Sequence, residues 1–138
     1  MAGRRGGPKT RCSGMWTEAR FTSFIKSALR SNSRKWKPLQ DTLKEARVER
    51  GVYECAACKQ HVKKTTIHNG KRVNNANVDH IDPIIDPSKG FTTWDDFIER
   101  LFCERDKLQV LCHVCHEEKT NKEKAIAKER RDSEKSSD

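Results

Sequence analysis

Residues 108–120 read LQVLCHVCHEEKT, and residues 55–58 read CAAC, so the chain carries two CxxC pairs. A CxxC turn places two thiolates on one side of a tight knuckle, and two knuckles complete a tetrahedral sulfur site. Zn²⁺ suits four thiolates because it is borderline-soft and redox-inert. The spacing therefore predicts a structural zinc site that joins distant segments, with the ligands Cys55, Cys58, Cys112 and Cys115.

Two other uses of these cysteines are a thioredoxin-like redox pair and buried free thiols. A redox CxxC belongs to a βαβ context and needs only one pair, and neither condition fits here. The remaining cysteines have no partner at ligand spacing. Cys103 lies beside an apolar helix face and is expected in the core, whereas the sequence gives Cys12 no role.

The composition predicts a small core and a polyanionic partner. Of the 138 residues, 33% are hydrophobic and 36% are charged, so metal binding is expected to help hold the fold. The net charge is +9, and residues 1–50 alone carry 13 Lys/Arg against four Asp/Glu. Such a block favours binding to nucleic acid, because phosphate contacts release counterions. The alternative is a solvated arm with no partner.

No stretch approaches the length of a membrane span, and the N-terminus MAGRRGGPKTR has no apolar region typical of a secretory signal. We therefore expect a cytoplasmic protein with no membrane partner. In a reducing compartment the cysteines are thiols or metal ligands.

The pattern along the chain predicts four regions. Residues 1–14 are Gly-rich and basic, which indicates a flexible arm. A basic helical region is expected over residues 15–51, with helices at 15–29 and from Pro38 to about Arg50. The main domain then covers residues 52–131, and a disordered tail covers residues 132–138.

Within the main domain, short strands and two helices are expected. VYECAACKQHV reads as a strand carrying the first Cys pair, and Asn69-Gly70 between two β-prone runs predicts a hairpin whose second strand reaches Ile81. Thr92 or Thr93 is placed to cap an apolar helix, residues 108–111 read as a buried strand, and a charged helix is expected over 115–131.

An acid–histidine centre is predicted from three residues: Asp79, His80 and His116. Adjacent side chains on a strand point to opposite faces, so one of Asp79 and His80 can hold a divalent ion while the other faces a substrate. An ion with few protein ligands keeps open positions, as catalytic ions do. By itself a histidine beside a knuckle can also be an alternative zinc ligand or a surface residue. His61, His68 and His113 are interpreted as surface residues, although His113 is placed to reach DNA.

These motifs together resemble the HNH endonuclease family. The family pattern is a DHI at a strand end followed by N-L-Q-x-L-C-x-x-C-H-x-x-K-T, and residues 78–81 and 108–120 follow it in order and spacing. The first Cys pair matches the upstream knuckle of zinc-bearing members. The resemblance covers about residues 52–125. It implies an α+β fold: a ββα-metal (His-Me finger) core with a two-knuckle, four-cysteine zinc site, here preceded by N-terminal helices.

The resemblance also implies residue roles. By its place in the motif, His80 resembles the general base of the family. Neutral imidazole suits this role because it takes a proton from water near neutral pH. Asp79 and His116 resemble the ligands of a catalytic divalent ion, expected to be Mg²⁺, or Mn²⁺ or Ni²⁺ because of the histidine. As the resemblance implies, the ion would contact the scissile phosphate, and the expected products are a 5′-phosphate and a 3′-hydroxyl. Lys119 is a candidate phosphate contact or a plain exposed lysine.

One position departs from the family pattern. The asparagine that braces the loop carrying the base histidine is replaced by Lys107, with Asp106 before it. Lysine is a donor only and cannot supply both a donor and an acceptor. Asp106 is a candidate substitute through its carboxylate, Lys107 is a candidate phosphate contact, and weakened activity is a third outcome.

The resulting hypothesis is an HNH endonuclease that hydrolyses phosphodiester bonds and nicks double-stranded DNA. Small proteins of this layout are typical of phages, so phage packaging proteins are candidate partners and the host cytoplasm is the expected location. The alternative is a catalytically weak or inactive HNH-fold DNA-binding or packaging adaptor. A third idea is a redox-regulated protein that uses the CxxC pairs. The sequence leaves open the target site, the oligomeric state and the choice between homing, packaging, degradation and restriction.

Overall fold

The computed structural model of the chain describes residues 7–136 and separates it into two units, residues 1–34 and 35–138. The fold is mixed α+β, with four helices and small antiparallel sheets in the described part. Residues 1–6 of the predicted arm and residues 137–138 of the predicted tail lie outside the described residues.

The first unit is a small strand pair followed by one helix. Strand β1 (Lys9–Arg11) pairs antiparallel with β2 (Trp16–Thr17), so the predicted flexible arm contains a strand. Helix α1 (Glu18–Ser33) begins three residues later than predicted, because residues 16–17 belong to β2. The Thr17 side chain accepts a hydrogen bond from the Arg20 N–H and caps the helix.

The second unit begins with helix α2 (Lys37–Ala46), which has Pro38 in its first turn as predicted. The helix ends before the predicted Arg50, because β3 (Arg47–Glu49) leaves it to pair with β4 (Val52–Glu54). The two strands turn at Gly51, whose φ of +75° suits glycine. Strand β5 (His61–Lys63) pairs with the other edge of β4, so the predicted single strand around the first Cys pair is two strands joined by the CAAC turn.

The Asn69-Gly70 hairpin forms as predicted. Strands β6 (Thr65–His68) and β7 (Lys71–Asn74) pair across it, and both turn residues have positive φ. The prediction that the second strand continues to Ile81 is wrong. The chain breaks at Asn75, whose N–H donates to the Lys64 carbonyl, and at Ala76, which is buried.

Strand β8 (Asn77–His80) therefore leaves the hairpin and pairs antiparallel with β9 (Leu108–Leu111), the strand predicted for residues 108–111. Between them lies helix α3 (Trp94–Leu101), capped by Thr93, and a 3₁₀ turn (Arg105–Lys107). Burial explains why β8 pairs with β9 and does not extend the hairpin. Strand β7 is largely exposed, whereas β9 offers the buried side chains of Leu108, Val110 and Leu111.

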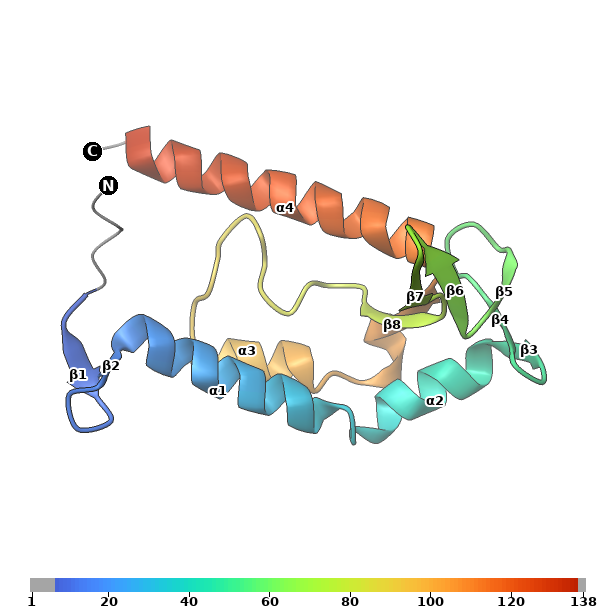
Figure 1. Ribbon diagram of the computed structural model, residues 1–138, viewed down its shortest axis with the longest axis horizontal. Helices are drawn as coiled ribbons and strands as arrows, with labels where there is room; N and C mark the ends of the chain where they lie inside the picture. Colours follow the sequence, from blue (N-terminus) through green and yellow to red (C-terminus); the bar gives the residue numbers. More distant parts are fainter. Residues whose placement is uncertain (1–6, 137–138) are drawn as a thin grey trace. The chain divides into compact units, whose positions relative to one another are not determined.

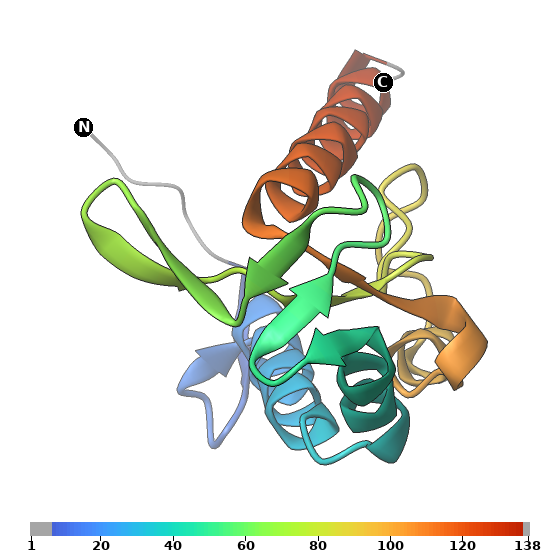
Figure 2. The same ribbon diagram turned by 90° about the vertical axis from the view of Figure 1, so that its right-hand side faces the viewer.

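Helix α4 (His113–Ser136) follows β9 directly and is longer than the predicted 115–131. It also includes most of the predicted disordered tail. Figure 1 and Figure 2 both show the β8–β9 pair between α2 on one side and α4 on the other. The two strands thus have one face toward each helix.

The core is small, as the composition predicts. Its buried apolar side chains in the described part are Cys55, Ala76, Phe97, Leu101, Leu108, Val110, Leu111 and Cys112. Two of these eight are cysteines of the CxxC pairs. Within residues 7–136, no helix combines the length and apolarity that crossing a bilayer requires.

Candidate functional site

The four cysteines of the CxxC pairs converge on one point. Their Sγ atoms all lie within 4.8 Å of one another, and the Sγ atoms of Cys58 and Cys112 are 3.8 Å apart. Thiolates on a tetrahedral zinc ion, with Zn–S near 2.3 Å, lie about 3.8 Å from one another. The cluster could therefore hold a metal ion such as zinc.

Local backbone contacts shape both knuckles. The N–H of Cys112 points at the Cys55 sulfur at 3.3 Å, and the N–H of Cys115 points at the Cys112 sulfur at 3.5 Å. The Ala56 N–H donates to the Val110 carbonyl, which ties the first knuckle to β9. These backbone contacts hold together two segments that are more than 50 residues apart in the sequence, so that their cysteines form one cluster.

The pKa values of the thiols in the cluster shift in opposite directions. Burial acts to raise the pKa of Cys55, but hydrogen bonds from backbone N–H groups of Cys112, Cys58 and Ala57 outweigh it and bring the pKa to about 6. The Cys112 sulfur raises the pKa of Cys115, with burial adding to the effect. Burial also raises the pKa of Cys112, so the Cys55 thiolate forms readily while Cys112 and Cys115 keep their protons, as expected where like charges converge without a cation.

The β8–β9 pair presents two chemically different faces. Asp79 pairs with Gln109 in the register and His80 pairs with Leu108. Because side chains alternate along a strand, Asp79 points toward α4 while His80 points to the opposite side. The structure therefore brings Asp79 together with the α4 residues His116 and Lys119, whereas the His80 side chain, from the residue after Asp79, lies on the other face.

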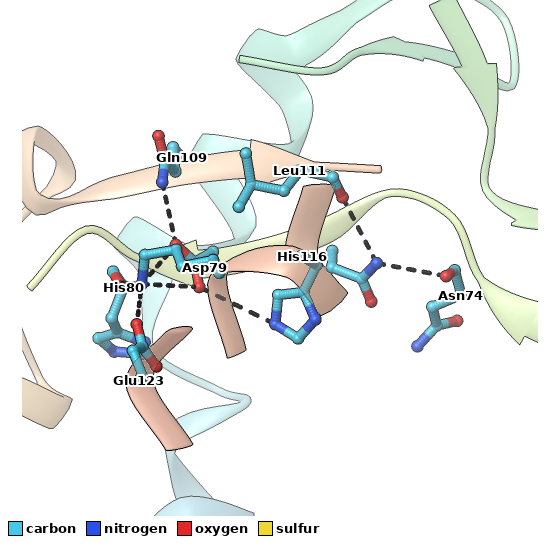
Figure 3. A network of polar contacts seen from close by, with 9 residues as sticks. Asn74, Asp79, His80, Gln109, Leu111, His116 and Glu123 are labelled. Atoms are coloured by element: carbon cyan, nitrogen blue, oxygen red, sulfur yellow. Dashed lines mark hydrogen bonds and ion pairs between the residues drawn. The ribbon is translucent and has the colours of Figure 1, made fainter. Parts of the chain in front are cut away.

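Asp79 is the centre of the α4-side network, which Figure 3 shows. Its side chain is only 10% exposed, and it accepts a hydrogen bond from Gln109 Nε2 at 3.0 Å. The Lys119 Nζ lies 3.3 Å from Asp79 Oδ2, and the His116 Nε2 lies 3.9 Å from Oδ1. A buried carboxylate requires such partners, because an isolated charge would carry a large desolvation cost.

Lys119 is directed inward rather than into solvent. Its Nζ also donates to the His80 carbonyl at 3.0 Å and to Glu123 Oε1 at 2.5 Å. Burial acts to lower the pKa of Lys119, but the hydrogen bond to Glu123 and the charges of Asp79 and Glu123 outweigh it and raise the pKa. The ammonium therefore stays charged at neutral pH and joins β8 to α4.

The His80 imidazole is held by the end of α3. Its Nε2 lies 3.0 Å from the Leu101 carbonyl oxygen, and a carbonyl only accepts hydrogen bonds. Nε2 therefore carries the proton, and in the neutral ring Nδ1 is the nitrogen with a free lone pair. This contact fixes both the tautomer and the direction of the ring.

The position that departs from the family pattern contacts the loop after β8. The Lys107 carbonyl accepts a hydrogen bond from the Ile81 N–H at 2.9 Å, and its Nζ lies 3.6 Å from Asp82 Oδ2. Both charged side chains are more than half exposed, and Asp106 is exposed as well. Residue 107 thus braces the loop through its backbone, with a weak surface ion pair in addition.

Sequence reasoning gave no role to Gln109 and Glu123, which complete the Asp79 network. Gln109 can be found only once the β8–β9 register is known, because it lies opposite Asp79 in a strand 30 residues away. Glu123 had a detectable signal, since it lies four residues after Lys119 on a predicted helix.

Comparisons with family models, with curated proteins and with solved structures find no match for this chain. The functional argument therefore depends on the residues and their geometry.

Proposed function

We propose that this protein is a metal-dependent DNA endonuclease of the HNH type that nicks duplex DNA. The observation that carries the proposal is the arrangement of acidic and histidine side chains at the end of β8. The Asp79 carboxylate approaches the His116 imidazole on one face, and the His80 imidazole extends from the next residue on the other. Strands β8 and β9 are separated by α3 and followed by α4, and this order supports the strand–strand–helix core that the HNH resemblance implies.

The residues fit a divalent ion beside Asp79 and His116. Their side chains offer a carboxylate oxygen and an imidazole nitrogen 3.9 Å apart, a donor pair that suits Mg²⁺, Mn²⁺ or Ni²⁺. The His116 side chain is 39% exposed, so a phosphate can approach from solvent. When bound, the ion would supply Lewis-acid stabilisation of the charge that develops on the phosphate and the leaving oxygen.

His80 would act as the general base. Its Nδ1 accepts a proton from the attacking water while the Leu101 carbonyl keeps the ring in place through Nε2. Asp79 and His80 are consecutive, so their side chains flank the end of β8. A phosphodiester lying across that strand end can be contacted from both sides.

The first unit would supply most of the DNA affinity. Residues 1–34 contain eight Lys/Arg and a single acidic residue. On α1 and at its C-cap Arg34, basic side chains follow one another every four residues and line a surface hollow with serines between them: Ser23, Lys26, Ser27, Arg30, Ser31 and Arg34. Hydroxyl, ammonium and guanidinium groups on one helix face are typical phosphate contacts.

Structural zinc at the four-cysteine cluster completes the proposal. The 3.8 Å separation of the Cys58 and Cys112 sulfurs agrees with the edge of a tetrahedral Zn–S site. Zinc would hold the first knuckle against the start of α4, and so position His116 relative to Asp79.

The direct test is the conversion of supercoiled plasmid to nicked circles by the purified full chain. We expect nicking with Mg²⁺, Mn²⁺ or Ni²⁺ and none with EDTA. One set of metal ligands in each chain cuts one strand, so open circles should precede linear DNA. The assay follows the circular forms on agarose gels over time, for the wild type and for the His116→Ala variant.

His61→Ala is the matched control, because His61 is also an exposed histidine but lies on β5, away from the Asp79 network. We expect it to nick at the wild-type rate, whereas His116→Ala should lose metal-dependent nicking. If the wild type binds plasmid and leaves it intact with all three metals, the nuclease proposal is wrong.

One observation favours a second candidate, a DNA-binding adaptor that has lost hydrolysis. The Lys119 ammonium already lies 3.3 Å from Asp79, so this carboxylate is neutralised without a metal ion. An adaptor would bind DNA equally well after loss of Asp79, His80 or His116, but not after loss of the basic residues of α1. Binding without nicking in the plasmid assay would therefore support this candidate.

Replacing Lys107 with asparagine is expected to change the free energy of unfolding by less than about 1 kcal/mol, because the Lys107–Asp82 pair is exposed. The backbone contact to Ile81 remains. Asparagine supplies both a donor and an acceptor, so we expect a nicking rate at or above that of the wild type. Urea unfolding and initial nicking rates measure the two effects. A loss of about tenfold in rate at unchanged stability would instead indicate that the Lys107 ammonium contacts DNA.

A further inference from the structure

A second group of ligand-type side chains lies outside the two sites above. His68 ends β6 beside the hairpin turn, His113 begins α4, and Glu117 follows His113 by one helical turn. One ligand atom from each of the three lies within 4.8 Å of the other two. The group thus joins the β6–β7 hairpin to the first turn of α4.

The distances suit coordination of a single ion. The His113 Nε2 is 3.2 Å from Glu117 Oε2, and the ring centroids of His68 and His113 are 4.6 Å apart. Ligands about 2.0–2.2 Å from a tetrahedral zinc ion lie about 3.3–3.6 Å from one another. Small side-chain rotations therefore bring all three ligand atoms to coordination distance.

The burial of the His113 Nε2 atom provides an independent observation. Its Nε2 is the one buried side-chain polar atom in residues 7–136 that has no hydrogen-bond partner. Glu117 is close enough, but the alignment is not that of a hydrogen bond. A buried nitrogen without a partner is costly, and a metal ion would satisfy it. The His113 side chain as a whole is 22% exposed, and His68 is exposed as expected.

The backbone already holds the group in place. The His113 N–H donates to Asn75 Oδ1 at 2.9 Å, which ties the residue after β7 to the first residue of α4. His113 and Glu117 are four residues apart on one helix and so share a face. The group therefore needs little reorganisation to bind an ion, and preorganised ligands favour binding.

We infer that His68, His113 and Glu117 form a second metal site, selective for a borderline transition metal such as zinc. Two imidazoles and one carboxylate are a typical zinc donor set, and three protein ligands leave one position for water. The bound ion would fix the exposed β6–β7 hairpin to α4. The inference does not depend on the nuclease proposal, because it uses none of the residues of the Asp79 network.

The test is a calorimetric titration of the full chain with Zn²⁺, after purification with the four-cysteine cluster already loaded. The His116→Ala background is used throughout, so that the proposed Asp79–His116 site does not contribute. We expect one further zinc ion per chain. Loss of a residue that only supports a ligand weakens metal binding by about 10–100-fold, so His68→Ala and Glu117→Gln should each weaken this uptake by at least about tenfold.

His61→Ala is again the control, and it should take up the further zinc as its parent does. Both substituted residues are exposed, so the variants should keep the fold and the cysteine-bound zinc, which far-UV circular dichroism and metal analysis verify. The inference is wrong if no further zinc binds, or if either His68→Ala or Glu117→Gln leaves the uptake unchanged.

Discussion

Replacing Cys112 with serine is expected to unfold the unit of residues 35–138. Cys112 belongs to the four-cysteine cluster that could hold zinc and, with Cys55 and Leu111, to the buried core cluster. Structural zinc contributes about 10–16 kcal/mol of binding free energy in small domains, whereas a whole domain is stable by only about 5–15 kcal/mol. Losing one of four ligands therefore removes an amount comparable to the total stability.

Thermal melting followed by far-UV circular dichroism measures this effect, with and without a strong chelator. The wild type should melt cooperatively and lose the transition on chelation, and the Cys112→Ser variant should lack it in both conditions. Cys12→Ser is the control, because Cys12 is exposed and lies in the other unit. A Cys112→Ser variant that melts within a few degrees of the wild type would show that the core alone supports the fold.

Local signals in the sequence were sufficient for several elements. The CxxC spacing predicted the convergence of four thiols, because each knuckle depends on a few adjacent residues. The Asn69-Gly70 turn and the Thr93 cap are equally local, and both form as predicted. In each case a short-range conformational preference agrees with the tertiary structure.

The pairing of strands far apart in the sequence could not be predicted from the sequence pattern. Residues 71–81 read as one strand, yet β8 separates from β7 and pairs with a strand about 30 residues later. Strand propensity is similar in both halves, and only the burial of β9 selects the partner. The inward direction of Lys119 has the same origin, because it depends on the position of Asp79 beside α4.

Replacing His80 with alanine is expected to reduce the nicking rate by about 10²–10⁴-fold, the usual contribution of a general base. The variant loses the nitrogen that would accept the proton from water, but leaves Asp79 and His116 intact. Stability should fall by only about 1 kcal/mol, because one hydrogen bond to the Leu101 carbonyl is lost. A large fall in nicking rate with a small fall in stability thus distinguishes a general base from a residue that only supports the fold.

The experiment measures nicking rate, plasmid affinity by gel shift, and unfolding for the wild type, His80→Ala and His61→Ala. A general base predicts that affinity and melting stay near wild-type values while the rate falls. The Asp79 network, which is held by Gln109 and Lys119 from the other face, does not require the His80 ring. If His80→Ala nicks within about fivefold of the wild type, the proton acceptor lies elsewhere and the role proposed for this residue is wrong.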